Sequence, residues 1–144
     1  MGVDARLYLK PMGPTFIAYA FARAAGEETN DNIHSGSRFL KATSVAGMFH
    51  IDLKEATPTM FCVTEGPTGP ATMIMARSRP EIIALFEAVA DVLGGVVVYN
   101  DYDDLSRTYI NPRAEEEDYV TLETALRNMP KAEVKAEHKE LSAY

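Results

Sequence analysis

The side chains best suited to bind a ligand are cationic and aromatic residues spread over several short segments. They are Tyr8, Lys10, Arg38, Lys41, His50, Arg77, Arg79 and Tyr99. Lysine and arginine bind anions through charge-assisted hydrogen bonds, and tyrosine and histidine add stacking surface and further hydrogen bonds. Together these residue types predict a site for a small anionic, nucleotide-like ligand or for a protein partner, without catalysis.

Metal chemistry is disfavoured by the spacing of the available ligands. The histidines are His34, His50 and His138, and Cys62 is the single cysteine. A zinc site needs three or four ligands close together, and these residues fall in separate segments. A calcium loop opening at Asp101 would have Ser106 where an EF-hand requires glycine. We therefore predict no metal and no cofactor.

Two loops have the composition to hold an anion through backbone N–H groups. They are EGPTGP at 65–70 and HSGSRFLK at 34–41, the second with Arg38 and Lys41 as added charge. Neither matches a nucleotide-binding motif, and loops of this kind are usually turns.

Two other function classes remain open. Asp101 and Asp103 follow a predicted strand and, with His50, would form the centre of a small nucleotide-processing hydrolase. Seven of the 21 acidic residues lie between Asp101 and Asp118, and the net charge is −7. This balance argues against direct nucleic-acid binding, which needs a basic face, but it leaves an acidic mimic of DNA as an alternative.

Length and composition indicate one soluble domain. The chain has 144 residues, of which 47% are hydrophobic and 24% charged. No apolar run is long enough to span a bilayer, and Asp4 and Arg6 stand where a signal peptide is apolar. With a single cysteine, a cytoplasmic location is expected. We predict one domain over 1–130 and a charged helical tail over 131–144.

The first elements are a strand and a helix. Alternation over 5–10 predicts a half-buried strand. The alanine-rich segment that follows predicts a helix with Thr15 as N-cap and Gly26 just beyond its end, although its alternating alanines also permit a strand. The polar stretch 27–37 predicts a loop.

The middle of the chain predicts an antiparallel meander and a second helix. Short alternating runs fill 38–77. Ser78 and Glu81 then have the spacing of a capping box, apolar residues recur at helical spacing, and Gly94 and Gly95 end the helix. Residues 95–101 predict a buried strand.

The C-terminal part predicts a further helix. Asn111 and Pro112 have the types of an N-cap and a first helical residue, and Pro130 would end or kink the helix. The tail beyond it has few large apolar residues, and like charges fall on the same stripes of a helix. A packing partner would relieve this repulsion, and a homo-oligomer is therefore expected.

This order of elements predicts an α+β fold. It contains the strand-helix-strand-strand-helix-strand series of a ferredoxin-like split βαβ, with an extra hairpin and an appended C-terminal helix. Both helices should cover one face of the antiparallel sheet. The opposite face should then carry the outward residues Tyr8, Lys10, His50, Met75, Arg77 and Tyr99.

Two blocks resemble small accessory proteins encoded by bacteriophages. They are the opening MGVDARLYL and the helix that runs into VLGGVVVYNDYDD. The resemblance implies an accessory binding role in the host cytoplasm, such as inhibition of a host defence protein or sequestration of a nucleotide signal. It implies no catalytic residues.

Overall fold

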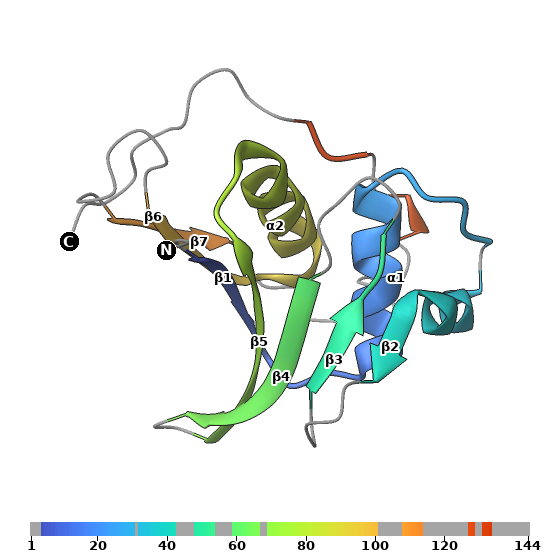
Figure 1. The fold of residues 1–144 in the computed structure, drawn as a ribbon, viewed down its shortest axis with the longest axis horizontal. Helices are drawn as coiled ribbons and strands as arrows, with labels where there is room; N and C mark the ends of the chain where they lie inside the picture. The colour runs from blue at the N-terminus through green and yellow to red at the C-terminus, as the bar shows by residue number, and fades with distance from the viewer. Residues whose placement is uncertain are drawn as a thin grey trace.

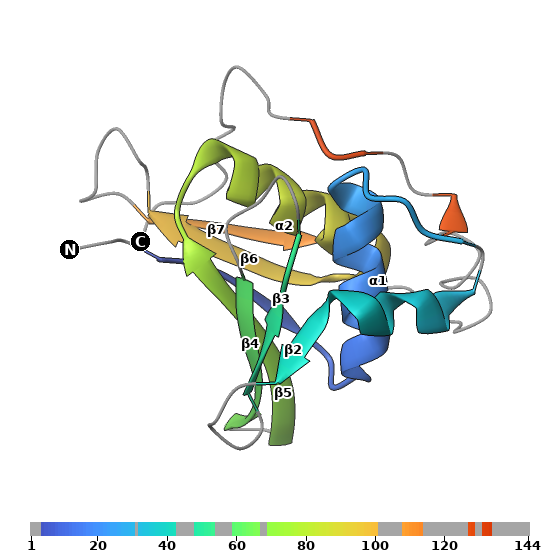
Figure 2. The ribbon, with the colours of Figure 1, turned by 45° about the vertical axis from the view of Figure 1, so that its right-hand side comes forward.

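A mixed arrangement of strands and helices is seen in the computed structural model, which describes residues 4–30, 32–42, 48–53, 59–66, 69–100, 108–113, 127–128 and 131–133. The elements are β1 (Asp4–Leu9), α1 (Pro14–Ala24), the 3-10 helix η1 (Ile33–Phe39), β2 (Leu40–Ala42), β3 (Met48–Ile51), β4 (Thr59–Gly66), β5 (Gly69–Arg77), α2 (Pro80–Leu93), β6 (Gly95–Asn100) and β7 (Thr108–Arg113). Figures 1 and 2 show α1 and α2 on the same side of the sheet, crossing each other.

The described strands form one seven-stranded sheet in the order β2-β3-β4-β5-β1-β6-β7, and each neighbouring pair is antiparallel. The predicted α+β class is confirmed. β1 lies between β5 and β6, which α2 connects, so this connection is a split βαβ. The order β4-β5-β1-β6 is consistent with the predicted ferredoxin-like arrangement.

The segment predicted as a helix, for which a strand was also permitted, is the helix α1. Its N-cap is Gly13 and not Thr15, because Pro14 has the fixed φ that suits a first helical position and lacks the N–H that would be left unpaired there. The predicted end is confirmed. Gly26 has φ 77°, its N–H donates to the Arg23 carbonyl, and the Glu27 N–H donates to the Ala22 carbonyl. These bonds form a Schellman motif.

α1 is buried on nearly all sides, which explains its alanine content. Eight of its eleven residues are buried, among them four alanines. Small side chains allow neighbouring backbone segments to approach closely. At Gly36, the backbone of η1 lies directly against the backbone of α1. A β-carbon at Gly36 would lie 2.4 Å from the Thr15 carbonyl oxygen.

η1 occupies part of the segment predicted as a loop. Its N-cap Asn32 accepts a hydrogen bond from the His34 N–H (3.0 Å). This cap favours a helical turn, and the strand predicted to begin at Arg38 therefore starts only at Leu40.

α2 ends where it was predicted to end but starts one residue later. Its N-cap is Arg79, one residue after Ser78, and Pro80 takes the first helical position. The predicted capping box is therefore wrong in register, although Glu81 still lies in the first turn, where a carboxylate is favourable. Gly94, with φ 79°, ends the helix as predicted.

Asn111 and Pro112 do not start a helix. They lie in β7, in register with Val97 and Val96 of β6. Proline is tolerated in an end strand of a sheet, and this position overrides the helix-start signal. Of the rest of the predicted C-terminal helix, Arg127 and Asn128 are described, and Arg127 is helical. The other residues after Arg113, with Pro130, lie outside the described part of that helix. Residues 131–133 of the predicted helical tail are described and lie in no helix or strand.

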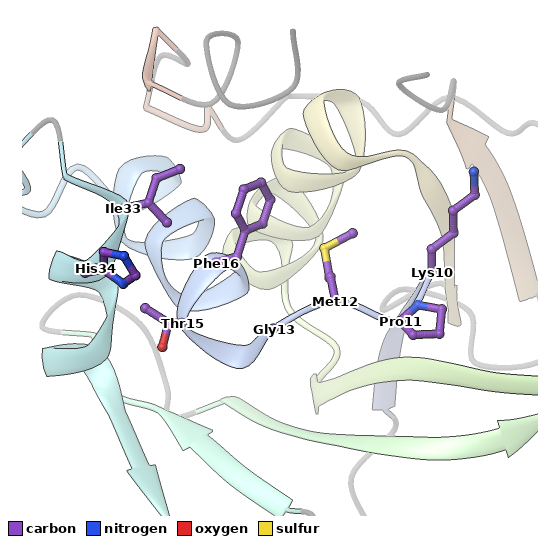
Figure 3. Close-up of a pocket in the computed structure, with 8 residues that line it drawn as sticks. All are labelled: Lys10, Pro11, Met12, Gly13, Thr15, Phe16, Ile33 and His34. Atoms are coloured by element: carbon purple, nitrogen blue, oxygen red, sulfur yellow. The ribbon is translucent and has the colours of Figure 1, made fainter. Parts of the chain in front are cut away.

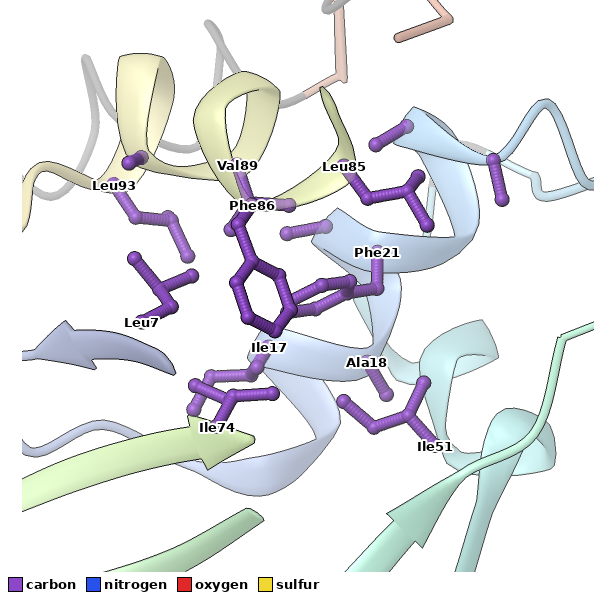
Figure 4. Close-up of a cluster of buried hydrophobic side chains, with 14 of the residues drawn as sticks. Leu7, Ile17, Ala18, Phe21, Ile51, Ile74, Leu85, Phe86, Val89 and Leu93 are labelled. Atoms are coloured by element: carbon purple, nitrogen blue, oxygen red, sulfur yellow. The ribbon is translucent and has the colours of Figure 1, made fainter. Parts of the chain in front are cut away.

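The core lies between the helices and the sheet (Figure 4). Phe21 of α1 and Phe86 of α2 meet edge to face with ring centroids 5.8 Å apart. Leu7 and Ile74 from the sheet close the same cluster, and both are fully buried. Within the described residues, no helix is long and apolar enough to cross a membrane.

Candidate functional site: the open face of the sheet

The sheet face opposite α1 and α2, here called the open face, is defined by the alternation of β1. Ala5, Leu7 and Leu9 are buried toward the helices, and the intervening residues of β1 are exposed. Successive side chains of a strand point to opposite faces, so Arg6 and Tyr8 belong to the open face.

Strand register extends the open face across the sheet in two rows. Among the residues whose side chains are described, the first row runs through Lys41, His50, Met75, Arg6 and Val98. The second runs through Met48, Met73, Tyr8 and Val96. In both rows, a methionine of β5 and a valine of β6 flank β1.

The centre of the open face is apolar and partly accessible to solvent. Met73, Met75, Val96 and Val98 are each half-buried. Tyr8, between them in the register, is 36% exposed and is the one large hydrophobic side chain among the described residues that counts as exposed. Within the described part of the chain, this face therefore retains apolar surface that is partly accessible.

Charged side chains lie within and around this centre. Arg6 is exposed in the first row, between Met75 and Val98 in the register. Arg77 is exposed at the end of β5, in register with Asp4. At the β2 side, Lys41 forms an ion pair with Asp52, with 2.6 Å between the ammonium nitrogen and the carboxylate oxygen. The Lys41 charge is therefore partly compensated.

The structure brings four of the predicted site residues to the open face. Tyr8, Lys41, His50 and Arg77 share it, as does the predicted outward residue Met75. Tyr99 does not. It is 3% exposed and lies on the helix-covered side. Val98, the residue before it, pairs with Arg6 of the open face, so the Tyr99 side chain points to the opposite face.

The other three predicted residues lie elsewhere. Arg38, in η1, donates a hydrogen bond to the Glu28 carbonyl (2.7 Å) and lies over the Phe39 ring. Arg79 is the N-cap of α2. Lys10 follows β1 and lines a cavity beside α1.

The predicted anion loop at 34–41 is not an open cradle. Its middle residue Gly36 packs against the backbone of α1, and Lys41 pairs with Asp52. The other candidate loop is the β4–β5 hairpin, in which Glu65 pairs with Pro70 and Gly66 with Gly69. Residues 67 and 68, between these strands, lie outside the described residues.

Sequence reasoning missed the apolar centre of the open face. Arg6, Met73, Val96 and Val98 were not among the predicted site residues. The alternation over 5–10 already separated Arg6 from the core. Val96 and Val98 carried no such signal, because the run from Val96 to Tyr99 is apolar at every position.

No cluster of three or more potential metal ligands occurs among the residues that the structure describes. Asp101 and Asp103, on which the hydrolase alternative depends, lie outside the described residues, as do 114–118 of the acidic segment. Comparison of the chain with protein-family models, with curated proteins and with solved structures gave no match.

Proposed function

We propose that this chain is a non-enzymatic binding protein that docks a partner protein on the open face of its sheet. The observation that supports the proposal is the half-buried apolar centre formed by Met73, Met75, Val96 and Val98 around Tyr8. Contiguous exposed apolar surface on a folded protein is typical of an interaction site.

The composition of this face favours a protein over a small ligand. Methionine, tyrosine and arginine are enriched at protein interfaces, and methionine adapts its shape to a partner. The face presents all three types, with Arg6 and Arg77 exposed beside the apolar centre. The phage resemblance adds the proposal that the partner is a host protein which the chain inhibits.

Site-specific photo-crosslinking tests this proposal in host cells. A benzophenone amino acid placed at Tyr8 should give a discrete adduct with a partner protein, because this side chain is exposed at the centre of the open face. The same amino acid placed at Asp91, exposed on α2, is the matched control and should give none.

A charge placed in the apolar centre should then abolish docking. We expect Met73→Glu to lower the adduct yield about tenfold, since Met73 lies opposite Tyr8 in the register and a carboxylate there would be buried in the interface. Asp91→Lys should leave the yield unchanged. Absence of an adduct from Tyr8, or equal adducts from both positions, would contradict the proposal.

A nucleotide ligand is the competing outcome. If nucleoside triphosphates raise the melting temperature and Arg77→Glu removes that effect, the open face binds small anions and the protein-docking proposal fails.

A further inference from the structure

Arg6 places a charge inside the apolar centre of the open face. In the register it lies between Met75 of β5 and Val98 of β6, and Tyr8 is the next residue of β1 on the same face. Arg6 is exposed, whereas Met75 and Val98 are half-buried. A partner that covers the apolar centre therefore also covers the Arg6 guanidinium.

Within the described part of the chain, Arg6 has no hydrogen-bond or ion-pair partner. The described carboxylate on the same strand and face is that of Asp4, which lies opposite Arg77 in the register. At the β2 side of the face, Lys41 already pairs with Asp52. The exposed guanidinium of Arg6 is therefore hydrated in the free protein.

Docking would remove this water from Arg6. Arginine has five N–H donors and keeps its charge in proteins, so its burial without an acceptor is strongly unfavourable. A carboxylate accepts two parallel hydrogen bonds from a guanidinium and neutralises its charge. A partner that covers Arg6 must bring such an acceptor to the same point.

The surroundings of Arg6 indicate what carries this carboxylate. The half-buried side chains of the centre are Met73, Met75, Val96 and Val98. A free small anion would pair with Arg6 and leave these side chains uncovered. An aspartate or glutamate flanked by apolar residues of a protein satisfies the charge and covers the apolar surface together.

We infer that the partner docks through a segment with one acidic residue among apolar residues, and that this carboxylate pairs with Arg6. The inference rests on the docking function proposed above and adds the chemistry of the partner's segment to it. Arg6 then selects the partner, because an apolar segment without a carboxylate leaves a buried charge unpaired.

Substitutions at Arg6 test the inference in the photo-crosslinking assay with the benzophenone amino acid at Tyr8. Arg6→Met removes the charge and keeps an apolar stem, and should lower the adduct yield at least about tenfold because the partner's carboxylate loses its counter-charge. Arg6→Lys keeps the charge and should lower the yield less than Arg6→Met does. Arg79→Met, at an exposed cation outside the face, is the matched control and should leave the yield unchanged.

The direction of the Arg6→Met effect distinguishes the inference from purely apolar docking. If the partner offers no carboxylate, Arg6→Met removes the cost of burying a charge and should raise the yield. An unchanged or higher yield, in a variant whose melting temperature matches that of the wild type, would overturn the inference and leave the docking proposal standing.

Mass spectrometry of the adduct then locates the cross-linked segment of the partner, which is synthesised as a peptide. The acid peptide should bind the wild type at least about tenfold more tightly than a peptide with the corresponding amide. Against Arg6→Met the two peptides should bind within about twofold of each other, since the pair is already broken. A segment without aspartate or glutamate would overturn the inference.

Methyl NMR with the acid peptide shows where the segment lies. The methyl resonances of Met73 and Met75 should shift in a saturable manner. Met12 is the reference, because it lines a cavity beside the start of α1, on another part of the molecule (Figure 3). A shift at Met12 alone would place the segment away from Arg6 and overturn the inference.

Two results would overturn the inference together with the docking proposal. One is the absence of any adduct from Tyr8 in the wild-type background. The other is an adduct only with a second copy of this chain, which would make the occupant of the open face the protein itself.

Discussion

Gly36 shows how a single residue fixes the position of η1. A β-carbon there would lie 2.4 Å from the Thr15 carbonyl oxygen and 2.7 Å from the Tyr19 backbone nitrogen. Both atoms belong to the backbone of α1 and cannot move without moving the helix. We expect Gly36→Ala to lower the free energy of unfolding by about 1–3 kcal/mol, as measured by urea denaturation.

Gly13 provides the matched control for this substitution. A β-carbon at Gly13 meets nothing within 4 Å, and its φ of −63° suits any residue. Gly13→Ala should change the free energy of unfolding by no more than about 0.5 kcal/mol, because two effects oppose each other. Alanine is a poorer N-cap than glycine, but it also reduces the conformational entropy of the unfolded chain. Equal losses in the two variants would contradict close packing of η1 on α1.

At the scale of elements, the Schellman motif at the end of α1 depends on backbone that only glycine adopts without strain. Gly26 has φ 77°. Gly26→Ala should destabilise the protein by about 1–2 kcal/mol, the cost of the left-handed conformation for an L-residue. Gly26→Asn should cost less, since asparagine tolerates this region. Thermal unfolding followed by circular dichroism would show the order, and the reverse order would contradict the assignment.

The helices also show which sequence signals are reliable. The apolar spacing and the glycines predicted the existence and the ends of α1 and α2, because apolar residues at helical spacing form a buried face and glycine adopts a positive φ without strain. The N-caps were misplaced, at Thr15 and at Ser78. In both cases a proline, Pro14 or Pro80, takes the first helical position and so determines the cap. Proline was the stronger signal.

At the scale of the whole molecule, a hydrogen bond joins the C-terminal end of α1 to a residue more than 100 positions later in the chain. The Ala132 N–H donates to the Ala24 carbonyl at 2.8 Å. Ala132→Pro removes this donor and should lower the free energy of unfolding by about 1 kcal/mol. Ala132→Ser keeps the N–H and is the control. If both variants retain full stability in urea, the bond contributes nothing measurable.

The open face could be predicted only in part, because strand register is a property of the whole sheet. Tyr8 and Arg77 were placed on it by alternation within their own strands. Tyr99 was misplaced, since an apolar run has no internal face signal and only pairing with β1 decides which side it takes. The helix start predicted at Pro112 was wrong for another reason. Proline occurs both at helix starts and in the outer strands of sheets, so its presence alone does not distinguish the two.

The outer strands bear on the solubility of the protein. One border of the sheet is β2, which is only three residues long, and the other is β7, where Pro112 interrupts the run of N–H donors. Short borders and border prolines hinder the addition of further strands from neighbouring molecules. Among the described strands, the two borders therefore offer few continuous N–H donors to which a strand of a neighbouring molecule could add.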